Sequence, residues 1–215
     1  MHAASRLCLV LGASIVPVLL VSEAGAQGTY QAHVGHVMEG FPGAPDGAAL
    51  LSVAQEDAAV AAQHAELAGG EQTNLDPMVQ HAQHVLHALD PSAAENGPGS
   101  GFGVGPAADA IAEHIELAAG ADGAPEPVVT HSAHVATAAR AVSERSAEMV
   151  EVANSIIEAS DYSVAYPLVQ QLQELAGQLV AGADASGDGE IGLDEGGLEL
   201  VETHMGLMSS AALAQ

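Results

Sequence analysis

The histidines of this chain are spaced in a way that would let their side chains bind metal ions. The sequence contains 11 histidines, and six of them form three pairs with the spacing His-x-x-His. The pairs are His33 with His36, His81 with His84, and His131 with His134. Residues three apart lie on the same face of an α-helix, so each pair could chelate one metal ion if its segment is helical. His87 extends the second pair along the same stripe.

Two of these pairs belong to a stretch that occurs twice. The copies begin near Ala61 and Ile111 and align without a gap at an offset of 50. Each copy contains a single histidine, His64 or His114, then a glycine-containing break, a proline and the His-x-x-His pair. Self-similarity at a fixed offset indicates a repeated structural unit. We expect that unit to be an αα-hairpin.

Each hairpin is expected to present three imidazoles to one ion. The single histidine and the pair lie at similar distances from the turn, so they reach nearly the same height when the helices run antiparallel. The predicted sites are His64, His81, His84 and His114, His131, His134. Three imidazoles suit Zn, Cu, Ni or Fe. His204 is a candidate to complete a further site with His33 and His36.

Two alternatives use the same histidines differently. A helical bundle could bind haem b between two imidazoles and act as an electron carrier. An open three-histidine site could also activate water for hydrolysis. No acid or base stands out beside the histidines in the sequence, so we expect a protein that binds metal for storage, delivery or sensing, and not an enzyme.

A second pattern lies near the C-terminus and consists of oxygen donors. Residues 184–195 read DASGDGEIGLDE and resemble the calcium-binding loop of EF-hand proteins. The resemblance implies calcium ligands at Asp184, Ser186, Asp188, Glu190 and Glu195, with Glu190 using its backbone carbonyl. EF-hands usually pair, so this single loop could pack on the helical body or form a homodimer. A further alternative is an acidic structural protein stabilised by calcium, without a transition metal.

The N-terminus and the composition predict an exported protein. Residues 1–26 form a candidate signal peptide, with Arg6, an apolar run and the small-x-small site Ala24-Gly25-Ala26. Cleavage there would leave 189 residues with no cysteine, which excludes disulfides, iron–sulfur clusters and c-type haem. The 27 acidic and two basic residues that remain keep the formal charge at −25. Such a charge repels nucleic acid and anionic lipid and concentrates cations, so we expect a periplasmic or secreted protein that is free of the membrane after cleavage.

Apolar residues follow the helical period, and alternating β patterns are absent, so the fold class is all-α. We expect a helical bundle of two repeated αα-hairpins, over about 58–89 and 108–139, followed by a single EF-hand helix-loop-helix. The bundle would cover residues 27–160, and the segment 161–215 would pack on it. Helices are expected over 29–40, 48–68, 77–89, 107–119, 127–159, 167–181 and 193–208. A glycine-, proline- and serine-rich stretch, 95–106, would be a flexible linker between the copies.

Overall fold

The computed structural model describes residues 29–70 and 72–213, and the regular structure within these ranges is entirely helical. The α-helices are α1 (Tyr30–Met38), α2 (Leu50–Gly69), α3 (Leu75–Leu89), α4 (Val104–Gly120), α5 (Glu126–Ile157), α6 (Tyr162–Ala181) and α7 (Leu198–Leu213). Two short 3-10 turns, η1 (Pro45–Gly47) and η2 (Leu193–Glu195), precede α2 and α7. The all-α prediction is therefore confirmed. The predicted signal peptide, residues 1–26, lies outside the described residues.

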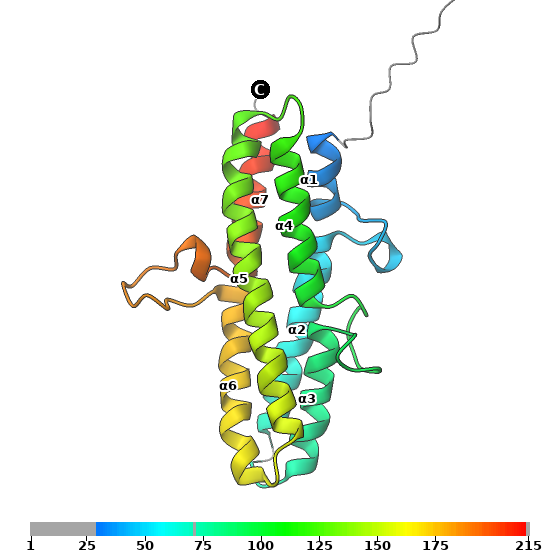
Figure 1. Ribbon diagram of the computed structural model, residues 1–215, viewed down its shortest axis with the longest axis vertical. Coiled ribbons are helices and arrows are strands. Elements are labelled where there is room, and N and C mark those ends of the chain that lie inside the picture. The colour runs from blue at the N-terminus through cyan, green and yellow to red at the C-terminus, as the bar shows by residue number, and fades with distance from the viewer. Residues whose placement is uncertain (1–28, 71, 214–215) are drawn as a thin grey trace, which may run out of the picture.

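Helix α5 is the axis of the bundle. It is 32 residues long and packs against α3, α4, α6 and α7. Figure 1 shows that α2, α3 and α6 surround its C-terminal half, whereas α1, α4 and α7 lie around its N-terminal half. The buried stripe on α5 includes Val128, Val135, Val142, Met149 and Ile156, all of which contribute to the core. The helices that carry histidines therefore form two groups, one around each half of α5, and α5 carries histidines of its own.

Two helices begin earlier than predicted because a capping side chain outweighs a proline. Helix α3 begins at Leu75, where the Asn74 side chain accepts a hydrogen bond from the Asp76 amide at 3.2 Å. Helix α6 begins at Tyr162, and Asp161 accepts from the amides of Ser163 and Val164. Its proline, Pro167, lies inside the helix. An N-cap side chain satisfies amides that have no helical partner, so it fixes where the helix starts.

The segment between α3 and α4 is tied to the bundle and does not match the expected flexible linker. Asp57 on α2 is 1% exposed. Its carboxylate accepts hydrogen bonds from the Ser100 amide (2.6 Å), the Ser100 hydroxyl (2.5 Å) and the Gly103 amide (3.0 Å). Gly103 has φ +92° and caps α4. A buried acidic side chain thus sets where the second half of the bundle starts.

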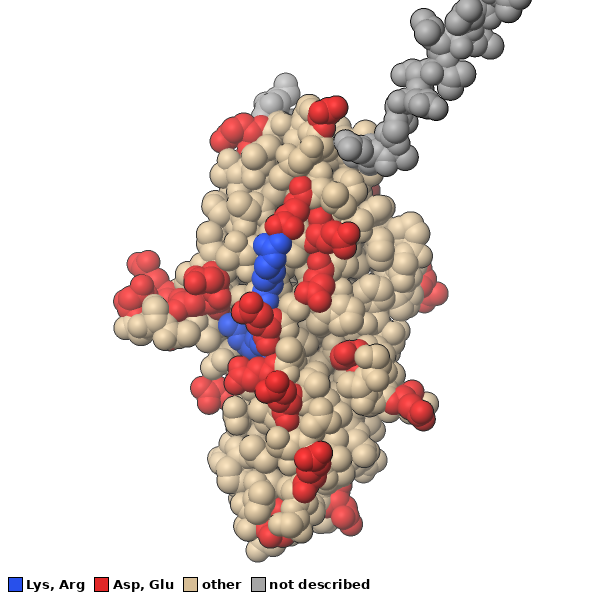
Figure 2. Space-filling view, viewed as in Figure 1, with Lys and Arg blue, Asp and Glu red and all other residues tan. Residues whose placement is uncertain are grey.

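The described surface is strongly acidic. Figure 2 shows acidic side chains spread along the whole length of one face, with the two basic side chains close together among them. These are Arg140, which pairs with Glu116 at 2.5 Å, and Arg145, which donates to the carbonyls of Glu195 and Gly196. Within the described ranges, no helix has both the length and the apolar character needed to cross a membrane.

Candidate metal centres

Nine histidines converge in three groups of three. The groups are His33, His36 and His114; His64, His81 and His84; and His131, His134 and His204. We call them the α1/α4, α2/α3 and α5/α7 triads after the helices that carry them. In each triad one helix supplies the His-x-x-His pair and the other supplies a single histidine. The ligand atoms of each group lie within 4.8 Å of one another, so each triad can hold one metal ion.

The three triads have nearly the same geometry. The single histidine and the first histidine of the pair have ring centroids 5.2–5.4 Å apart in all three. The single histidine and the second histidine of the pair are 4.6–4.7 Å apart in a T-shaped arrangement. Within the pairs the separation is 5.7–6.1 Å. Six different helices therefore build one arrangement three times.

In each triad the Nδ1 atom of the single histidine faces the Nδ1 atom of the first histidine of the pair. The Nδ1 atoms are 3.0 Å apart between His64 and His81, and 3.3 Å apart between His64 and His84. The corresponding first contacts of the other triads are 3.0 and 3.1 Å. Imidazole nitrogens bound at about 2.0–2.1 Å to a tetrahedral ion lie about 3.3 Å apart, so the observed spacing fits one ion with a fourth position left open.

Two of the nitrogens have no hydrogen-bond partner. The Nδ1 atoms of His36 and His134 are buried and unpaired, and both residues are the second member of a His-x-x-His pair. Buried polar atoms are normally satisfied, and an unsatisfied one calls for a ligand, ion or water. Three imidazoles cannot satisfy one another around a common centre, because a shared contact needs one donor for each acceptor. A cation accepts all three lone pairs at once.

Folding lowers the pKa of at least one histidine in each triad. Burial, followed by repulsion from the neighbouring imidazoles, lowers the pKa of His64 below its usual value, and burial followed by repulsion from His84 does the same for His81. The same two causes lower the pKa of His33, His114 and His204. A metal ligand must be the neutral imidazole, so these shifts prepare the sites for metal at neutral pH.

The metal-free protein should lose stability on acidification from pH 7.5 to 5.5. Folding lowers these histidine pKa values, so below about 6.5 the unfolded chain binds more protons than the folded chain, and a falling pH favours unfolding. The carboxylates with lowered pKa values, such as Asp184 and Glu195, act only below about pH 4.5 and stay outside this window. Urea denaturation at both pH values measures this effect, and the midpoint urea concentration should be lower at pH 5.5 than at pH 7.5.

The control is the triple substitution His64→Gln, His114→Gln and His204→Gln, which removes one imidazole from every triad. It should flatten the pH dependence of the urea midpoint. An unchanged slope in this variant would contradict the assignment of the effect to the triads.

The structure confirms one predicted grouping and corrects two. His64, His81 and His84 lie together as expected. The grouping of His114 with His131 and His134 is wrong, because His114 faces α1 and the pair on α5 faces α7. The grouping of His204 with His33 and His36 is wrong for the same reason. The distance from a turn fixes the height of a side chain along a hairpin, but not the direction in which it leaves the helix axis.

Two contacts, one at a triad and one outside the triads, were not predicted. The Phe41 ring packs edge-on against His36 and His114, with centroids 5.4 and 5.2 Å away, so the α1/α4 triad has an aromatic wall. His87 lies outside the triads, and its Nδ1 donates to the carbonyl of Ala94 at 2.9 Å. It therefore holds the segment after α3, and its prediction as a metal ligand finds no support in this contact.

The acidic loop between α6 and α7 projects from the side of the bundle in Figure 1. Asp184 accepts hydrogen bonds from the amides of Gly187, Asp188 and Gly189, and these bonds lower the pKa of its carboxyl. Glu195 accepts from the amides of Gly192 and Ser186, which lowers its pKa as well. The loop is therefore folded around its two end carboxylates. It is not among the groups of described residues that bring three metal-binding atoms within 4.8 Å.

No protein-family model, curated protein or solved structure matches this chain.

Proposed function

We propose that this protein binds three transition-metal ions, one in each histidine triad, and stores or delivers them outside the cytoplasm. The observation that carries the proposal is the threefold recurrence of one imidazole geometry on separate pairs of helices. A chance cluster of histidines would not repeat its ring distances. The location rests on the predicted signal peptide of residues 1–26.

The donor set favours an exchangeable ion. Each triad offers three nitrogens, a set that suits Zn, Cu, Ni or Fe and leaves a coordination position open. Structural zinc sites are usually closed by four protein ligands, whereas an open position admits an incoming ligand that can take the ion away. The formal charge of −25 draws cations toward the surface from all sides. Three open sites in one acidic chain provide capacity for a metal cargo.

The two alternative uses of the histidines fit this geometry less well. Two imidazoles that bind haem lie on opposite faces of the porphyrin, whereas the nitrogens here converge within 4.8 Å on one point. An enzyme needs one elaborated centre, with an acid or base placed beside the metal. Three near-copies made of histidine alone favour metal binding over catalysis.

We also propose that the loop of residues 184–195 binds calcium, as its resemblance to EF-hand loops implies. Asp184 and Glu195 are the first and last carboxylates of the pattern, and Ser186 donates its amide to Glu195 and its hydroxyl to Asp184. Gly187 and Gly189 adopt positive φ of +75° and +90°, which lets the chain turn tightly between these oxygens. The loop precedes α7, so a bound calcium would hold the start of that helix.

The test is the metal content of the purified chain after equilibration with zinc(II) and calcium and removal of free ions. We expect three zinc ions and one calcium ion per chain by elemental analysis. His64→Ala, His114→Ala and His204→Ala should each remove one zinc. Glu195→Gln is the matched control, which should lose calcium and keep three zinc ions. Zinc that persists in the triple alanine variant would overturn the triad assignment.

A further inference from the structure

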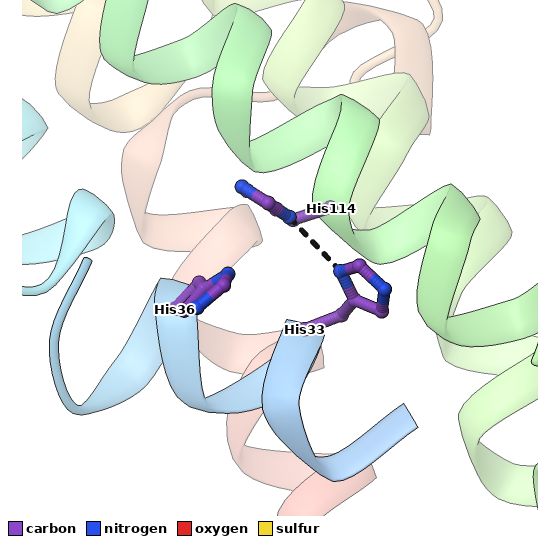
Figure 3. Close-up of side chains that lie close together, drawn as sticks. All are labelled: His33, His36 and His114. Carbon is purple, nitrogen blue, oxygen red and sulfur yellow. Dashed lines mark hydrogen bonds between the residues drawn. The ribbon is translucent and has the colours of Figure 1, made fainter. Parts of the chain in front are cut away.

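The three triads share their histidines' geometry but differ in what surrounds them. The chain contains two phenylalanines, and Phe41 packs against the α1/α4 triad while Phe102 packs against Phe41. Their rings are in edge-to-face contact with centroids 6.5 Å apart, and Phe41 is the one that reaches the imidazoles. Figure 3 shows His33 and His36 of α1 turned toward His114 of α4. No ring other than histidine is found against the other two triads among the described residues.

The position of Phe41 is fixed from several sides. Its backbone amide donates to the carbonyl of Ala48, and its own carbonyl accepts from the amide of Ala44, both at 3.0 Å. A Cβ atom on Gly43 would lie 2.6 Å from the Phe41 ring, so the ring occupies the space that any larger residue at position 43 would need. The segment between α1 and α2 therefore holds an aromatic ring against the triad.

Helix α1 has fewer buried side chains than any other helix that carries triad histidines. It has nine residues, and Val37 is its one buried residue. A helix this short is not stable alone, because isolated helices need about 12–15 residues even in favourable sequences. By contrast, α7 is anchored by the buried side chains of Leu198, Val201, Met205 and Met208. An ion at the α1/α4 triad would join segments 81 residues apart and fasten α1 to the bundle.

We propose that the three sites divide the work. The α1/α4 triad, against which Phe41 packs, holds a long-lived ion that fastens the N-terminal helix, whereas the α2/α3 and α5/α7 triads hold the exchangeable cargo. The inference rests on the proposed function, because it assigns roles to the same three sites. The Phe41 ring beside the imidazoles slows the approach of a competing ligand, and loss of the ion also breaks the link that the ion makes between α1 and α4.

The experiment is the release of zinc(II) from the full chain, with calcium present, into an excess of a chromophoric chelator. We expect two of the three ions to leave together and the third to leave at least ~10-fold more slowly, as a site needing a local opening before ligand exchange would. Phe41→Ala should keep three ions but bring the slow phase to the rate of the others. His114→Ala should abolish the slow phase, and the matched variant His64→Ala should remove one fast ion only.

Amide hydrogen exchange gives a second readout. Zinc should protect residues 30–38 in the wild-type chain and in His64→Ala, and should not protect them in His114→Ala. Release of all three ions at one rate, or a slow phase that survives His114→Ala, would overturn the division of roles while leaving three-site binding intact. A chain that binds no zinc would overturn the proposed function as well.

Discussion

Saturation with zinc(II) is expected to raise the free energy of unfolding by about 4 kcal/mol for each occupied triad when free zinc is about 1,000 times its dissociation constant. The unfolded chain binds far less strongly, because the triads join residues up to 81 positions apart and exist only in the folded bundle. Three triads give about 12 kcal/mol. For a chain of this size each triad corresponds to a rise in melting temperature of about 10 °C.

The measurement is thermal unfolding with and without zinc, followed by circular dichroism at 222 nm. His64→Ala, His114→Ala or His204→Ala should each remove about one third of the rise, and the triple variant should remove all of it. The metal-free forms of these variants serve as their own references. A triple variant stabilised by zinc as much as the wild type would place the binding elsewhere.

The parts of the site that follow from local geometry could be predicted from the sequence. The His-x-x-His spacing puts two imidazoles on one helical face, which holds for all three pairs. The α2/α3 triad was also predictable, because its helices are joined by a short turn that sets their relative height. His64 lies 17 positions before His81 and meets the pair on the next helix.

The partners of His114 and His204 could not be predicted in this way. Each contact crosses more than 70 residues of chain, and it depends on how the helices rotate about their axes when the core forms. On α4 the buried stripe contains Ile111, Ile115 and Ala118, and His114 flanks it on the side that α1 covers. The sequence repeat describes α4 and α5 as a hairpin, but it does not say which neighbour meets each flank.

A short motif, His-x-x-His-Val, occurs three times in the sequence and indicates three equivalent sites. Each His-x-x-His pair is followed at once by a valine, and Val37, Val85 and Val135 are all fully buried. The valine anchors its helix in the core and leaves the two histidines at the edge of the buried face. Three such motifs, with three single histidines elsewhere, match three sites better than the two sites expected from the 50-residue repeat.

Asp57→Ala is expected to lower the free energy of unfolding by about 3–5 kcal/mol, although Asp57 touches no triad. The change removes the acceptor of the buried Gly103 amide and of the partly buried Ser100 amide and hydroxyl. Each group left unsatisfied costs about 1–3 kcal/mol. The neighbouring Glu56 is exposed and gives the matched control, because Glu56→Ala should change the stability by less than about 0.5 kcal/mol.

Urea denaturation of the metal-free proteins measures both values. The folded Asp57→Ala chain should still bind three zinc ions, because α2 and α4 keep their core side chains. An Asp57→Ala protein as stable as Glu56→Ala would show that the segment between α3 and α4 is held by its own turns. A large loss would show instead that one buried carboxylate on α2 fixes the segment before α4 and the start of that helix.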